Sequence, residues 1–132
     1  MKMSIDNALG MMPQALSLRA ERTSILANNI ANADTPGFKA RDFNFHEVLS
    51  NRMQADAEGR LSQTNPQHMG HRSHSGSMDL QYRMPLMASL DDNSVDTQLE
   101  QAEFAANSTE FLTAFRLLNG RITGLMSAIK GE

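Results

Sequence analysis

The fold is decided by residues 96–130, which read DTQLEQAEFAANSTEFLTAFRLLNGRITGLMSAIK. Apolar side chains recur there at spacings of three and four, which is typical of a helix that packs along a seam. The expected seam residues are Phe104, Ser108, Phe111, Phe115, Leu118, Ile122, Leu125 and Ile129. Acids fill the first half and bases the second, an order that complements the helix dipole. The pattern predicts one helix roughly 50 Å long, at about 1.5 Å per residue.

Local signals refine this helix at both ends. Thr97 with Glu100 three residues later fits a capping box, and Asp96 offers an alternative N-cap. Near the C-terminus, Gly120 and Gly124 form a GxxxG step, although each glycine costs about 1 kcal/mol in a helix. We interpret these glycines as a place where a neighbouring helix approaches closely.

The N-terminal segment, residues 1–33, predicts a second helix. One apolar stripe is interrupted by Arg19 and Thr23; it comprises Ile5, Leu9, Met12, Leu16, Leu26 and Ile30. A neighbouring stripe comprises Met11, Ala15, Leu18 and Ile25. Pro13 suits a first turn, so the continuous helix should begin near it. The helix should end before Pro36, because proline discourages helix in the preceding residue and Pro-Gly suits a tight turn.

The middle segment, residues 34–93, differs from both ends. Asn44 followed by Glu47 predicts the start of a short helix that contains Val48, Leu49 and Met53. Three further stretches have distinct expectations: residues 54–78 are polar and should be unstructured in isolation, residues 80–85 read as extended, and residues 91–93 read as a turn.

The expected fold class is mainly α. Long N- and C-terminal helices pair in a coiled-coil-like layer, and an irregular middle segment contains a short helix and minor extended structure. Residues 1–33, 34–93 and 94–132 are thus three segments of one structural unit. Seven large apolar side chains on the C-terminal seam would contribute roughly 10–20 kcal/mol if covered. Two helices of one chain cover only part of that seam, so we expect the chain to complete its packing against copies or partners.

Composition excludes several function classes. The 132 residues leave room for one domain, and a net charge of −3 argues against nucleic-acid binding. The absence of cysteine excludes disulfides and thiolate metal sites. No apolar run approaches the roughly 20 residues of a membrane span, and no cleaved signal peptide is evident. Phosphate-loop and hydrolase motifs are missing, so we expect neither an enzyme nor a cofactor.

Two polar groups leave alternatives open. His68, His71 and His74 recur every three residues, but their Gly/Ser-rich setting favours a solvated segment over a metal site. Asn28, Asn29 and Asn32 crowd the end of the first helix. They indicate either fraying before the turn or hydrogen bonding to adjacent backbones in a packed assembly, and the sequence does not decide between the two.

Residues 27–43, ANNIANADTPGFKARDF, resemble the signature of bacterial flagellar rod and hook proteins. The likeness continues through YRMP at residues 82–85, SLDDNSVD at 89–96 and LNGRI at 118–122, and it spans nearly the whole chain. It is greatest for the members that form the proximal rod. The family usually has glycine where Asp92 stands, so the turn there is expected to differ in geometry.

The resemblance implies a structural subunit of the flagellar proximal rod in the periplasmic part of the basal body. Such subunits stack helically through their terminal helices, join the MS ring and FliE to the rest of the rod, and transmit torque. The implied partners are further copies, the rod proteins FlgC and FlgF, the adaptor FliE, the MS-ring protein FliF and the flagellar type III export apparatus. No nucleic acid and no membrane insertion are expected.

The expected subunit interface combines the turn and the seam. Its residues are Asn28, Asn29, Asn32, Thr35, Pro36, Gly37, Phe38, Phe104, Phe111, Phe115, Leu118, Gly120, Ile122, Gly124, Leu125 and Ile129. Two rival functions remain: a soluble helical adaptor or export chaperone that binds a partner helix, and a periplasmic metal-binding protein that uses the histidine run.

Overall fold

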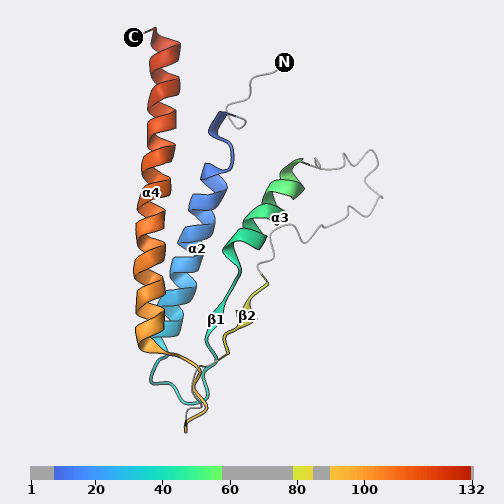
Figure 1. Ribbon diagram of the computed structural model, residues 1–132, viewed down its shortest axis with the longest axis vertical. Coiled ribbons are helices and arrows are strands. Elements are labelled where there is room, and N and C mark those ends of the chain that lie inside the picture. Colours follow the sequence, from blue (N-terminus) through green and yellow to red (C-terminus); the bar gives the residue numbers. More distant parts are fainter. Residues whose placement is uncertain (1–7, 58–78, 85–89, 132) are drawn as a thin grey trace, which may run out of the picture.

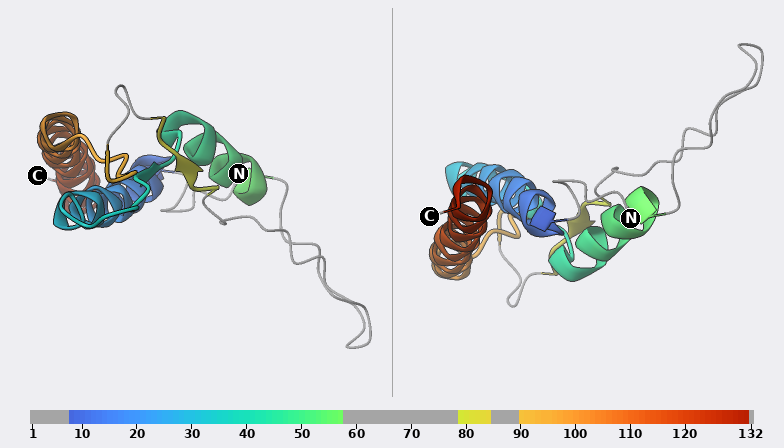
Figure 2. Two further views of the ribbon diagram at one scale, coloured as in Figure 1. Left: turned by 90° about the horizontal axis from the view of Figure 1, so that it is seen from below. Right: turned by 90° about the horizontal axis from the view of Figure 1, so that it is seen from above.

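The computed structural model describes residues 8–57, 79–84 and 90–131. Helices α2 (Met12–Ala31) and α4 (Thr97–Lys130) lie side by side and antiparallel (Figure 1). Helix α3 and the strands β1 and β2 lie on the opposite side of α2, as the end-on views in Figure 2 show. The mainly α class with paired terminal helices is confirmed. Within the described residues, we find no helix with the length and apolar character to cross a bilayer.

Helix α2 begins and ends where its proline and turn signals predicted. Pro13 stands in its first turn, and the backbone N–H of Asn32 caps it by donating to the carbonyls of Asn28 and Asn29 at 3.2 and 3.1 Å. The Pro-Gly turn follows, closed by a bond from the Phe38 N–H to a carbonyl three residues earlier, at 3.2 Å. Gly37 has a φ of 72°, the left-handed conformation that this turn position requires.

Helix α4 takes Asp96, and not the Thr97 capping box, as its N-cap. The Asp96 carboxylate accepts bonds from the N–H groups of Gln98 and Leu99 at 3.0 and 3.2 Å. Thr97 is therefore the first helical residue. The helix runs for 34 residues and ends at Gly131, whose φ of 76° is left-handed.

The middle segment forms α3 (Phe45–Ala57), β1 (Arg41–Asp42) and β2 (Gln81–Tyr82). The predicted cap is present, because the Asn44 side chain accepts from the Glu47 N–H at 3.3 Å. The two strands pair antiparallel, with Arg41 opposite Tyr82. Helix α3 extends to Ala57, so residues 54–57 of the polar stretch 54–78, which is predicted to be largely unstructured in isolation, are helical. Most of that stretch, including the histidine run, lies outside the described residues.

The hydrophobic core lies between α2 and the segment β1–α3. Leu18 is fully buried and packs with Phe43 and Leu49. Partly buried side chains that surround this cluster are Ala15, Ile25, Phe45 and Val48. On α2, the core therefore uses the neighbouring stripe, of which Leu18, Ala15 and Ile25 take part.

Candidate functional site

An ionic network joins α2, β1, β2 and α4. Arg22 binds Asp42 through both carboxylate oxygens, at 3.1 and 2.8 Å, and also binds Glu103 at 3.0 Å. Arg83 of the β2 segment donates to Asp42 at 2.5 Å and to Glu100 at 2.9 Å. Glu100 is only 1% exposed. These contacts fix the first part of α4 to α2 and to the segment that follows β2, and through Arg22 and Arg83 to β1.

Two groups of this network, Asp42 and Arg22, keep their charges at neutral pH. Burial raises the pKa of Asp42, but hydrogen bonds from Arg22, Arg83 and the Phe43 N–H outweigh it and hold that pKa below its ordinary value of 3.8. The hydrogen bond to Asp42 raises the pKa of Arg22. Both groups therefore stay ionised, which suits a structural joint and not proton transfer.

Asn29 is buried and serves the chain's own fold. Its side-chain N–H₂ donates to the Arg41 carbonyl at 2.8 Å and to Glu100 at 3.1 Å, and its oxygen accepts from the Arg41 N–H at 3.2 Å. The Asn29 amide thus bonds to both the carbonyl and the N–H of Arg41 in β1, as the backbone of a neighbouring strand would. Asn28 is exposed, and half-buried Asn32 donates to its carbonyl at 2.8 Å. Asn29 therefore bonds to the backbone of a neighbouring element of its own chain, whereas hydrogen bonding of the group in a packed assembly stays a prediction.

Asn107 forms the second buried joint between α2 and α4. It is fully buried, and its N–H₂ donates to the Arg19 carbonyl at 3.0 Å and to the Thr23 hydroxyl at 2.9 Å. The Arg19 guanidinium returns a bond to the Asn107 oxygen at 3.3 Å and pairs with Glu110. Arg19 and Thr23, which interrupt the apolar stripe of α2 in the sequence, are therefore its contact points with α4.

The Pro-Gly turn and the segment before α4 form one compact end, which we call the turn end (residues 32–39 and 90–96). The Asn93 side chain donates to three carbonyls, of Asn32, Ala33 and Thr35, at 2.6 to 3.1 Å. Asp92 has a φ of 59°. This is the left-handed conformation that glycine adopts freely and aspartate tolerates, so the chain keeps a glycine-type turn there without glycine.

The predicted seam of α4 is only partly covered by the described chain. Phe104, Phe111, Leu118 and Leu125 are half-buried, whereas Phe115, Ile122 and Ile129 are 52%, 39% and 83% exposed. The reason is geometric: at 3.6 residues per turn, the centre of the seam lies roughly 70° around the helix from the residues that contact α2. The exposed apolar residues on this side form a continuous surface, called the open stripe: Leu112, Phe115, Ile122, Met126 and Ile129.

The C-terminal part of α4 extends past the start of α2, as Figure 1 shows. Gly10, just before α2, lies close to the Arg121 side chain. At Gly120 and Gly124, a Cβ added to the backbone would meet no atom within 4 Å in the described part of the chain. The close approach predicted for these glycines is therefore not made by α2.

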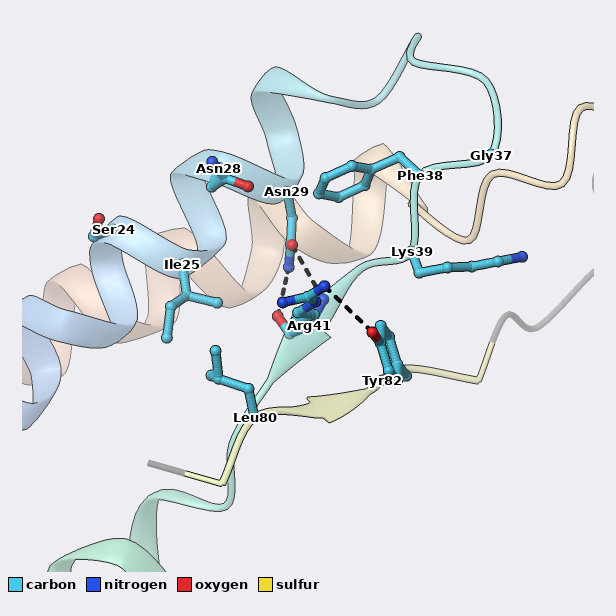
Figure 3. A pocket seen from close by; sticks show the side chains of 10 residues that line it. All are labelled: Ser24, Ile25, Asn28, Asn29, Gly37, Phe38, Lys39, Arg41, Leu80 and Tyr82. Atoms are coloured by element: carbon cyan, nitrogen blue, oxygen red, sulfur yellow. Dashed lines mark hydrogen bonds between the residues drawn. The ribbon is translucent and has the colours of Figure 1, made fainter. Parts of the chain in front are cut away.

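An open pocket of about 630 Å³ lies between α2 and the two strands (Figure 3). Its lining is Ser24, Ile25, Asn28, Asn29, Gly37, Phe38, Lys39, Arg41, Leu80 and Tyr82. The Arg41 guanidinium lies over the Tyr82 ring, 5.0 Å from its centroid. The lining has neither carboxylate nor imidazole, and in the described ranges we find no three such groups placed to hold a metal.

The structure divides the expected interface residues into two sets. Asn28, Asn29, Gly37 and Phe38 share the pocket near the turn end, with Asn32, Thr35 and Pro36 in the turn beside it. The remaining residues lie along α4. Sequence reasoning missed the polar residues that join the elements; the buried ones are Asn93, Glu100 and Asn107, and the half-buried ones are Arg22, Asp42 and Arg83. One signal was available, because the charged residues Asp42 and Arg83 stand inside the motifs ARDF and YRMP.

Comparison with known proteins agrees with this architecture. Residues 14–39 match a family model described as flagella basal body rod protein. The chain is 44% identical to FlgB of Aeromonas hydrophila over 100% of this chain and 99% of that protein. It is also 44% identical to FlgB of Cereibacter sphaeroides, with 94% of each covered, and 40% identical to FlgB of Escherichia coli K12, with 96% and 95% covered. The chain therefore belongs to the FlgB family of flagellar basal body rod proteins, structural components of the bacterial flagellum.

Proposed function

We propose that the chain is a subunit of the proximal rod that stacks helically through α2 and α4. In this role it connects the MS ring and FliE to the rest of the rod, transmits motor torque in the periplasm, and is required for flagellar assembly and motility. Its role is mechanical and not catalytic. The family assignment supports the rod location, and the open stripe of α4 supports stacking through the terminal helices.

The open stripe is the observation that carries the proposal. Its five side chains recur along about 26 Å of α4, since residues 112 to 129 rise about 1.5 Å each. Covering each of them would contribute on the order of 1.5–3 kcal/mol. Isolated exposed apolar residues are ordinary, but a continuous row on a long helix is typical of an interaction surface. A neighbouring helix would fit there, with Gly120 and Gly124 allowing close approach.

The buried joints support the mechanical part of the proposal. Torque loads the contact between α2 and α4, and this contact is held by paired charges and buried amides at Asn29, Glu100 and Asn107. Removing one partner from such a pair leaves a buried polar group unsatisfied, so the two helices keep one relative position. These contacts support the prediction that the segments 1–33, 34–93 and 94–132 belong to one structural unit.

The proposed partners are further copies, FlgC, FlgF, FliE and FliF, with the flagellar type III apparatus as the export route. The proposed contact surfaces are the exposed turn residues Asn28, Thr35, Pro36 and Gly37 and the open stripe. Asn29 contributes indirectly, since it holds β1 in place beside that surface.

Fractionation tests this function. An epitope-tagged chain, expressed in a motile strain that lacks the native one, should restore swimming and co-purify with detergent-extracted basal bodies. A chain that restores swimming but stays entirely in the soluble fraction would favour a cytosolic adaptor or export chaperone, whose partner helix would occupy the open stripe.

A further inference from the structure

We infer that the tail of α4 docks onto a carboxylate-bearing turn of the adjacent rod subunit, so that charge sets the axial order of the contact. This inference rests on the proposed function and names the chemistry of one of its contacts. The tail (residues 111–131) is an exposed helix end that carries apolar and cationic side chains together. It needs an occupant that is acidic and has apolar groups beside its acids.

The tail is cationic throughout. Residues 111–131 contain Arg116, Arg121 and Lys130 and no acid, a net charge of +3 that Glu132, the residue after them, lowers to +2. All three cations are exposed. In the described part of the chain, the ion pairs of α4 use acids of its first half, at Glu100, Glu103 and Glu110. Within the described residues the three cations of the tail form no ion pair, and we take them as the groups that meet a partner.

Apolar side chains stand among these cations. Met126 and Ile129 are 51% and 83% exposed and lie on the same stretch of helix as Arg121 and Lys130. An apolar surface rimmed by charges of one sign favours a partner that supplies both apolar area and the opposite charge. A free anion or a purely apolar groove would satisfy only half of this surface.

The chain itself shows what a rod-subunit turn offers. The turn end carries exposed Asp34, Asp91, Asp92 and Asp96 against one cation, Lys39, a net charge of −3. Leu90 stands fully exposed beside them. A turn of this composition has the acids and the apolar side chain that the tail requires.

The positions of the two ends exclude a contact inside the chain. Asp96 caps the first residue of α4 and Lys130 closes its last turn, so the 34 residues of the helix, roughly 50 Å, separate the turn end from the end of the tail at Lys130. Figure 1 shows them at opposite ends of the long axis. Subunits stacked with one polarity bring the tail of one against the turn end of the next. Such a heterologous contact does not close on itself and extends along an axis.

Zero-length cross-linking tests the contact directly. A carbodiimide joins a lysine amine to a carboxylate only where the two touch, and the chain has one lysine, Lys130, in its tail. Purified basal bodies would be treated with the reagent and the linked peptides sequenced by mass spectrometry. The Lys39–Asp92 pair, 2.7 Å apart, is the internal positive control. We expect Lys130 linked to an aspartate or glutamate in the turn between the paired helices of a neighbouring rod subunit.

A charge-reversal variant tests the same contact through the assembly of basal bodies in cells. Arg116→Glu with Lys130→Glu should reduce the number of basal bodies per cell by roughly tenfold or more, because like charges would face each other across the contact. Gln101→Glu adds negative charge to the exposed turn half of α4 and is the control that should assemble normally. Circular dichroism of each purified variant verifies that α4 still forms.

The outcomes separate this inference from the proposed function. The inference alone would be overturned if the chain is present in basal bodies but Lys130 links only to acids on helix faces. It would also be overturned if Lys130 links to no acid while the Lys39–Asp92 control does link. Normal assembly of the double charge reversal would do the same. A chain absent from basal bodies would overturn both.

Discussion

The two halves of α4 face different environments. In the turn half, Thr97–Glu110, the helix meets α2 and β2 through buried Glu100 and Asn107, and their polar atoms are paired within the chain. In the tail half, residues 111–130, no residue is fully buried in the described chain, and the open stripe faces outward. One continuous helix thus has a self-contained half and an incomplete half.

This difference separates two tasks. Buried charges and amides tolerate few alternative arrangements, because each misplaced group loses a partner. The turn half therefore fixes how the two helices of one chain sit together. Apolar packing is non-directional and contributes mainly when a neighbour covers it, so the tail half suits contacts between chains.

The largest effect should follow a charge placed on the open stripe. Phe115→Asp would put an unpaired carboxylate where a neighbouring subunit packs, and we expect non-motile cells with normal amounts of the protein. Swimming in soft agar and counts of basal bodies measure it. Thr113→Asp is the matched control, because Thr113 is exposed and lies on the opposite side of the helix from Phe115. Equal loss of motility in both variants would contradict the open stripe as an interface.

Breaking the ionic network should be the largest perturbation of the turn half. Arg83→Ala removes one partner from Asp42 and from buried Glu100, and we expect the free energy of unfolding to fall by about 3–5 kcal/mol. Urea denaturation followed by circular dichroism measures it. Lys39→Ala breaks the exposed pair with Asp92 and should cost less than about 1 kcal/mol. Similar losses in the two variants would show that the network contributes no more than a surface pair.

Acid should weaken the contacts that α2 makes with β1 and α3. The pKa of Asp42 lies below its ordinary value of 3.8, and a hydrogen bond from Arg52 lowers that of Glu21 below 4.5. Both carboxylates bind fewer protons in the folded than in the unfolded chain, so their contribution is complete above those ordinary values and is lost as pH falls below them. The midpoint of urea unfolding at pH 7, 5, 4 and 3, in steps of roughly one unit or more, measures this loss of stability. In the Asp42→Asn variant, the midpoint should fall less as the pH is lowered. An unchanged dependence on pH would exclude Asp42 as its source.

The smallest effect is expected at the start of α4. Asp96→Ala removes the side chain that caps two N–H groups, which should lower the free energy of unfolding by about 1 kcal/mol. Thr97→Ala, one residue later, should change it by no more than a few tenths, because Thr97 is already helical. The same urea experiment compares them. A larger loss at Thr97 would restore the capping-box interpretation.

Local signals predicted the elements well. Pro13, the Pro-Gly turn and Asn44 each act through bonds within a few residues of themselves, so their effect is readable from the sequence. The apolar periodicity of residues 96–130 predicted the length of α4 for the same reason.

The joints between elements were not predictable in this way. Glu100 and Asn107 resemble solvated helix residues in the sequence, and their burial depends on partners as distant as Asn29 and Arg19. The direction of the seam also depends on where α2 packs, which periodicity alone does not give. The sequence therefore predicted that apolar residues of α4 stay uncovered. It did not predict the polar contacts of Glu100 and Asn107 with α2, which turn those apolar residues away from α2.

Amide hydrogen exchange, compared between the isolated chain and purified basal bodies, tests the division of α4 most directly. In the isolated chain we expect slow exchange at residues 97–110 and fast exchange at residues 111–130, and in basal bodies slow exchange across both. Equal protection of both halves in the isolated chain would contradict the claim that the tail half is completed only by neighbouring subunits.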